Sequence, residues 1–144
     1  MNFPILSSLI ILPTVGALFL LFLKDKNSNT SKYVALFTSF VNFLISIYLW
    51  YLFDPTTSSF QFLEDKKWLE NFVNYKVGID GISILFIILT TLITPLCIIS
   101  VNNTVKNRLR DFLIAILVME SLMIGVFCSL DLVVFYLFFE AGLI

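Results

Sequence analysis

Five long apolar stretches, separated by short polar connections, constrain the fold of this 144-residue chain more than any other feature. A helix rises about 1.5 Å per residue and the hydrocarbon core of a bilayer is about 30 Å thick, so one crossing needs roughly 20 apolar residues. The predicted helices span about 3–23, 33–53, 81–101, 111–129 and, incomplete, 131–144. We therefore predict an all-α integral membrane protein of about five transmembrane helices, forming a single membrane region over 1–144.

Composition excludes several classes of protein. The chain is 59% hydrophobic and only 13% charged, with a mean hydropathy of +0.98. Nine basic residues nearly balance ten acidic ones, so we expect contact with the lipid bilayer and none with nucleic acid. There is no histidine, and Cys97 and Cys128 lie within apolar runs, where we interpret them as packing residues. We therefore expect no metal, no cofactor and no catalytic site in this chain alone.

Basic residues predict the orientation in the membrane. The connection 24–32 contains three lysines, and the connection 102–110 contains one lysine and two arginines. These two connections are expected on the same, inner side, which places the N-terminus outside. The remaining polar segment, 54–79, is then expected on the outer face, where it caps neighbouring helices.

Two carboxylates interrupt the apolar runs. Glu120 lies nine residues after Asp111, and Glu140 lies nine residues after Asp131, where each aspartate stands at the start of a predicted helix. Both glutamates are therefore expected about 14 Å deep, near the midplane of the membrane. A carboxylate at that depth costs about 2.5 to 3.5 kcal/mol on insertion scales. Burial favours the neutral form of a carboxyl group, whereas a nearby cation favours its charged form. A buried carboxyl group beside a cation can therefore bind and release a proton. We predict proton transfer by both residues.

The alternative interpretation gives these acids a packing role only. Each could be protonated and donate a hydrogen bond to a backbone carbonyl or hydroxyl of a neighbouring helix. On its own helix Glu140 has no polar neighbour except Tyr136, so we expect its partner on a helix outside this sequence. Asp80 and Asp131 differ from both, because each stands at a helix start and is predicted to be an N-cap.

Three blocks of sequence resemble a known family. They are Val77-Gly-Ile-Asp-Gly-Ile-Ser83, Leu117-Val-Met-Glu-Ser121 and Asp131-Leu-Val-Val-Phe-Tyr-Leu-Phe-Phe-Glu140. In order and spacing they are similar to the antiporter-like subunit of proton-pumping NADH:quinone oxidoreductase (respiratory complex I), called subunit M in bacteria and subunit 4 in mitochondria.

This resemblance implies a subunit of about fourteen helices, of which the chain is the N-terminal third. It aligns Glu140 with the family's helix-five glutamate in the proton channel and Glu120 with the glutamate on helix four. In the family the helix-five glutamate works with lysines on later helices, and those helices are absent from this sequence. The chain alone is therefore expected to be inactive, as a fragment or as the product of a split gene that a second polypeptide completes.

The leading hypothesis is a non-redox, proton-translocating component of complex I. Its expected partners are the other membrane subunits, and its expected location is the bacterial or mitochondrial inner membrane. One alternative is a subunit of a multisubunit cation/proton antiporter. Another is a non-transporting membrane relic or scaffold whose acids serve packing only.

Overall fold

The computed structural model describes residues 4–23, 28–69, 73–101 and 109–143, and in these parts it contains five helices, as predicted, and one pair of strands. Four of these helices are long and apolar enough to cross a membrane, and the fifth is shorter. The elements are α1 (Ile5–Phe22), α2 (Ser28–Leu52), β1 (Gln61–Leu69), β2 (Val73–Ile79), α3 (Gly81–Ser100), α4 (Leu109–Cys128) and α5 (Leu132–Leu143).

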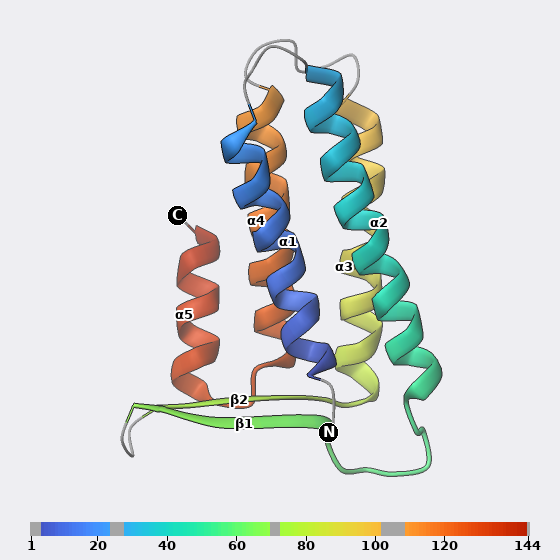
Figure 1. Cartoon of the computed structure of the whole chain (residues 1–144). Helices are drawn as coiled ribbons and strands as arrows, with labels where there is room; N and C mark the ends of the chain where they lie inside the picture. The colour runs from blue at the N-terminus through green and yellow to red at the C-terminus, as the bar shows by residue number, and fades with distance from the viewer. Residues whose placement is uncertain (1–3, 24–27, 70–72, 102–108, 144) are drawn as a thin grey trace.

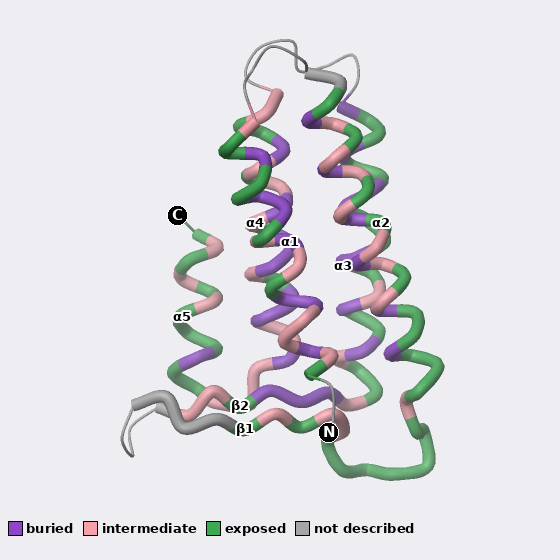
Figure 2. Tube along the Cα trace, viewed as in Figure 1, coloured by how far each residue is buried: buried purple, intermediate pink, exposed green. Residues whose placement is uncertain are grey.

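Helices α1 to α4 form an up-and-down bundle, and α5 stands beside α4 (Figure 1). The closest helix pairs are α1 with α4 and α2 with α3. Buried residues follow the inward faces, whereas much of the outward surface is exposed (Figure 2). Those outward faces are rich in large apolar side chains such as Phe22, Phe37 and Leu85. Because a soluble monomer rarely exposes so much apolar surface, these faces fit a lipid environment.

The polar segment 54–79 contains an antiparallel hairpin that the sequence analysis did not predict. Strands β1 and β2 pair with Glu64 opposite Val77 and lie across one end of the bundle (Figure 1). The backbone N–H of Leu130 donates to the carbonyl of Lys76 at 2.9 Å, which attaches the hairpin to the turn between α4 and α5. The hairpin thus covers helix ends, and its position on the outer face of a membrane stays a prediction.

A polar cluster attaches the hairpin to α1. The backbone N–H of Ser7 donates to Glu64 Oε1 at 3.4 Å, and its hydroxyl donates to Glu64 Oε2. The same hydroxyl lies 3.0 Å from the hydroxyl of Tyr75 on β2. Desolvation by the surrounding chain raises the pKa of Tyr75 above its ordinary value. The three side chains therefore join both strands to the start of α1.

Acidic side chains receive the first N–H groups of two helices at the hairpin end. Asp80 Oδ1 accepts from the backbone N–H of Ser83 at 2.8 Å at the start of α3. Asp131 Oδ1 accepts from the N–H of Val133 at 2.8 Å, and its Oδ2 accepts from the N–H of Asn74 at 3.4 Å. Asp131 therefore bonds both α5 and the hairpin.

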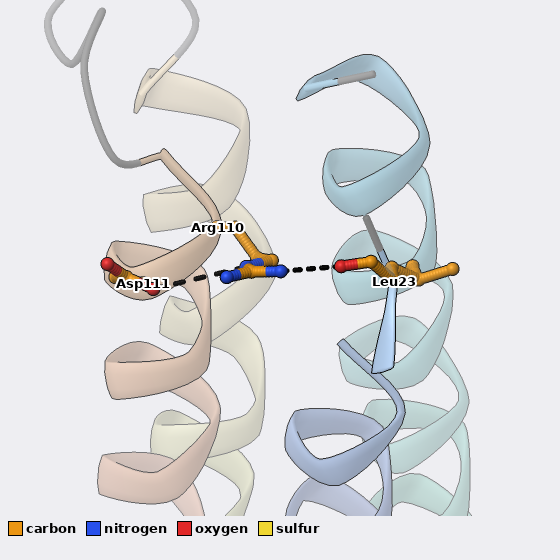
Figure 3. Close-up of polar contacts among 3 residues, drawn as sticks. All are labelled: Leu23, Arg110 and Asp111. Carbon is orange, nitrogen blue, oxygen red and sulfur yellow. Dashed lines mark hydrogen bonds and ion pairs between the residues drawn. The ribbon is translucent and has the colours of Figure 1, made fainter. Parts of the chain in front are cut away.

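At the opposite end of the bundle, an arginine joins two helices. Arg110 Nη1 donates to the carbonyl of Leu23 at 2.5 Å, and Arg110 Nε lies 4.0 Å from Asp111 Oδ1 (Figure 3). A cation at the C-terminal end of α1 also opposes the negative end of the helix dipole. Of the other basic residues used to predict orientation at this end, Lys24, Lys26, Lys106 and Arg108 lie outside the described residues.

We expect Asp80→Ala to destabilise the protein by about 0.5–2 kcal/mol, because it removes the acceptor for the Ser83 N–H. That hydrogen bond holds the pKa of Asp80 below its ordinary value of 3.8. Because the pKa of Asp80 is lower in the folded state, this stabilisation is present at pH values above the pKa of Asp80 in the unfolded chain. It is lost as pH falls through the pKa of Asp80 in the folded protein. Thermal unfolding in detergent, followed from neutral to strongly acidic pH, tests this. Asp80→Asn keeps the acceptor and should be nearly as stable at neutral pH but without this acid dependence; equal stability of Asp80→Ala and wild type contradicts the cap.

A glycine permits the contact between α4 and α5. A Cβ atom on Gly125 would come within 2.7 Å of the ring of Phe138, whereas one on Gly142 would have no neighbour within 4 Å. We expect Gly125→Ala to displace the ring and to lower stability by about 1–3 kcal/mol, and the matched Gly142→Ala to be neutral or slightly stabilising, because alanine favours a helix more than glycine does. Thermal unfolding of both variants measures this difference, and equal melting temperatures would argue against the close helix contact.

Candidate functional site

Glu120, on α4, is enclosed within the bundle and is 2% exposed. The side-chain Nδ2 of Asn42, on α2, donates to Glu120 Oε1 at 3.0 Å. Asn42 is itself fully buried. This contact joins residues 78 positions apart in the chain and places a carboxyl and a carboxamide against each other between two helices.

The hydroxyl groups of the neighbouring helices bond elsewhere. Thr90 donates to the carbonyl of Phe86 at 2.8 Å, and Thr94 donates to the carbonyl of Thr90 at 2.9 Å, both within α3. Ser121, next to Glu120 in the chain, donates to the carbonyl of Ile10 on α1 at 2.6 Å. Each hydroxyl proton is therefore engaged by a backbone carbonyl and not by the carboxyl.

Two buried acceptors at this contact have no protein donor among the described residues. They are Glu120 Oε2 and Asn42 Oδ1. A buried acceptor without a donor costs about 1–3 kcal/mol, so a pair of them at one contact requires a physical explanation.

A cavity of about 470 Å³ lies between α3 and α4, and Glu120 is part of its wall. Its other polar wall residues are Thr90, Thr94 and Cys97, and the rest of the lining is apolar or aromatic, including Phe86, Met119 and Phe127. Glu120 therefore borders a space large enough for water molecules or a small side chain, while its Oε2 is itself buried.

A second polar contact between helices extends the buried seam. The hydroxyls of Ser46 on α2 and Thr91 on α3 lie 2.8 Å apart, one helical turn from Asn42. The buried face of α2 repeats small or polar residues at intervals of three or four, namely Ser31, Ala35, Ser39, Asn42 and Ser46. Small and polar residues at this spacing favour close helix contacts in membranes.

Glu140 has different surroundings. It is half-buried on α5, and within the described parts of the chain it has no hydrogen-bond or ion-pair partner. Phe138 packs against Gly125 of α4, and Glu140 is about 200° further round the helix than Phe138. Its side chain therefore leaves α5 on the side away from Glu120.

The two predicted acids lie at similar distances from the turn between α4 and α5 without meeting. Glu120 is eight residues before the end of α4 and Glu140 eight residues after the start of α5, so each is about 12 Å from the connecting turn. Among the described residues no hydrogen bond joins them; Glu120 bonds to Asn42 instead. Sequence reasoning missed Asn42, although its place in the small and polar repeat of α2 was a usable signal.

The described residues contain no cluster of three or more His, Cys, Asp or Glu side chains that could hold a metal ion. Cys97 and Cys128 are both free thiols, on α3 and α4 respectively, the first exposed and the second buried.

Comparison with known proteins gives one consistent family. Residues 8–126 match the family described as NADH-ubiquinone oxidoreductase chain 4, amino terminus. NADH-quinone oxidoreductase subunit M of Rhodobacter capsulatus is 52% identical over 120 residues, which cover 83% of this chain and 22% of that protein. NADH-ubiquinone oxidoreductase chain 4 of Marchantia polymorpha is 43% identical over 140 residues, covering 96% of this chain and 28% of that protein.

A third relative extends the match over the whole chain. Subunit M of Rickettsia prowazekii is 39% identical over 148 aligned residues, covering 100% of this chain and 30% of that protein. The chain thus spans less than a third of the length of these curated relatives. Because the family match covers most of its residues, the chain belongs to the family of NADH-ubiquinone oxidoreductase chain 4, bacterial relatives of which are named subunit M.

Proposed function

We propose that this chain is a proton-translocating component of the membrane arm of NADH:quinone oxidoreductase, to which it contributes carboxyl groups of a proton half-channel. Electron transfer belongs to partner subunits in this proposal. The names of the relatives favour this function over a subunit of a cation/proton antiporter.

The observation that carries the proposal is the position of Glu140. An ionisable group in an apolar helix is expensive, and such groups typically pair with another side chain or line an ion pathway. Glu140 lies among Phe135, Leu137 and Phe139, which are all exposed, and it has no partner in the described chain. A carboxyl on an uncovered helix face is suited to pairing with a group from outside this sequence.

Glu120 supplies the second proton-binding group at similar depth. Its burial and its place in the wall of the cavity between α3 and α4 support a role in passing protons from within the bundle. We propose that protons move between Glu120 and Glu140 by way of water or side chains outside the described residues. Direct proton transfer between the two carboxyl groups is disfavoured, because the side chain of Glu140 points away from Glu120.

The proposed partners are the other membrane subunits of complex I and the helices that the longer relatives contain beyond the matched region. Those helices would come from the same or a second polypeptide and would provide the cation that Glu140 requires. The proposed location is the inner membrane of a bacterium or a mitochondrion.

We expect Glu140→Gln to abolish proton translocation while assembly is retained, because glutamine keeps the shape and polarity of the side chain but cannot release a proton. Loss of a group that transfers protons typically costs about 10² to 10⁴ in rate. NADH-driven acidification of vesicles carrying the assembled complex, followed with a pH-sensitive dye, measures translocation, and a native gel measures assembly.

Asp65→Asn is the matched control, because Asp65 is an exposed acid on the hairpin. It should leave both measurements unchanged. Normal acidification by the Glu140→Gln complex would refute the proposed role of this residue and would support a packing role instead.

The proposed partners can be tested by native gel electrophoresis of mildly solubilised native membranes, followed by mass spectrometry. We expect the chain to migrate with NADH:quinone oxidoreductase subunits. Comigration with small antiporter subunits, or with no other protein, would contradict the proposal.

A further inference from the structure

We propose that Asn42 and Glu120 form a carboxamide–carboxylic acid pair that holds one proton between α2 and α4, with Asn42 as the positioning residue for that proton. This rests on the proposed function for its role in transport, but the pairing itself does not depend on it. In the pair, Asn42 Nδ2 donates to Glu120 Oε1, and the proton on Glu120 Oε2 is donated to Asn42 Oδ1.

Hydrogen-bond accounting at the contact supports this pairing. The donation from Asn42 Nδ2 at 3.0 Å satisfies one oxygen of Glu120 and leaves one buried acceptor on each residue without a protein donor in the described chain. A single proton on Glu120 would give both residues their missing bond at once, because a planar carboxyl and a planar carboxamide can pair through two parallel hydrogen bonds.

Other donors from the packed helices are already engaged. The hydroxyls of Thr90, Thr94 and Ser121 all bond to backbone carbonyls. The hydroxyl of Thr91, also on α3, is engaged by Ser46 and by carbonyls of its own helix, and the thiol of Cys97, which lines the same cavity, is a weak donor.

Charged groups on the surrounding helices are distant. Helices α1 and α3 contain no Asp, Glu, Lys or Arg. Lys32 on α2 and Arg110 on α4 are ten residues from Asn42 and Glu120 respectively, about 15 Å along each helix. Glu140, on α5, leaves its helix on the far side. Without a nearby cation, a carboxylate at Glu120 would have only the Asn42 amide to stabilise it.

The pair links protonation to the contact between two helices. When the proton passes from Glu120 Oε2 to a water molecule in the adjoining cavity, Glu120 becomes a carboxylate and the water becomes hydronium. Asn42 Nδ2 can still donate, but Asn42 Oδ1 loses its donor. The amide must then turn or accept from water, so release and uptake of the proton alter how α2 contacts α4.

Infrared spectroscopy of the assembled complex in lipid vesicles tests the pair directly. A protonated carboxyl has its own carbonyl stretching band, which shifts in deuterated water. We expect Glu120→Gln to remove one such band without loss of assembly. Loss of a carboxylate band instead would overturn the proposal, because it would show that Glu120 is ionised.

Exchanging the two groups provides a sharper test. The double variant Asn42→Asp with Glu120→Gln keeps both side-chain sizes and keeps one carboxyl opposite one carboxamide. We expect it to assemble and to regain the protonated-carboxyl band that Glu120→Gln lacks. Failure to assemble, or assembly without the band, contradicts the pairing.

Asn42→Leu isolates the contribution of the amide. Without the donor from Nδ2, the Glu120 carbonyl should stretch at a higher frequency, a change that a purely structural role for Asn42 would not produce. The control is Ser39→Ala, one turn away on the same buried face, where the hydroxyl donates to the carbonyl of Leu36. It should leave the band in place. An unshifted band in Asn42→Leu would refute the contact, and if that variant does not assemble, the exchange variant decides.

Neither outcome depends on proton pumping. If the expected bands are found but the Glu140→Gln complex translocates protons normally, the pair is supported and the proposed function is refuted. If the bands are absent but Glu140→Gln abolishes translocation, the function is supported and the pair is refuted.

Discussion

The need to satisfy polar groups without bulk water governs this bundle. In hydrocarbon every backbone N–H and C=O must find a partner within the chain, which favours helices and penalises unpaired side chains. Most hydroxyls in the helices therefore donate to a carbonyl three or four residues earlier, as Thr38 does to Val34 and Ser39 does to Leu36. Such side chains present small, satisfied surfaces and let helices approach closely, as where Thr38 packs against Gly16. Polar bonds between helices are the exceptions, and they mark where two helices are held in register.

One of these exceptions lies beside a break in the hydrogen-bond ladder of α1. Proline has no backbone N–H, so Pro13 removes one rung of the hydrogen-bond ladder in the middle of α1. Close to this break, Ser121 of α4 donates to the carbonyl of Ile10 at 2.6 Å. The bond fixes α4 against α1 at the residue next to Glu120. The orientation of the carboxyl thus depends on α1 through Ser121 and on α2 through Asn42.

The sequence predicts the helices well because apolar length is a local property. The stretch 81–101 was predicted and Gly81–Ser100 is observed, and the small differences elsewhere are at helix ends. The hairpin was missed because only one of its two strands has a strand-like sequence pattern. Val73, Tyr75, Val77 and Ile79 alternate as a strand should, but the partner segment around Glu64 is dense in charge and resembles a loop. Its pairing depends on tertiary bonds to Ser7 and Leu130, which no local pattern reveals. The position of Glu120 along α4 follows from counting residues, whereas its partnership with Asn42 required the packing of two distant helices.

Glu120 and Glu140 differ in where their polar partners lie, and this difference bears on the proposed mechanism. Glu120 meets its partner inside the bundle, between α2 and α4, so the proposed pair would couple its protonation to the packing of these two helices. Glu140 is on a helix with a single buried residue, Val134, and its carboxyl group has no partner in the described chain. The proton affinity of Glu120 would therefore depend on the bundle itself. The proton affinity of Glu140 would depend on the groups that cover α5. Coupling to a partner can enter at Glu140 without disturbing the bundle that holds Glu120.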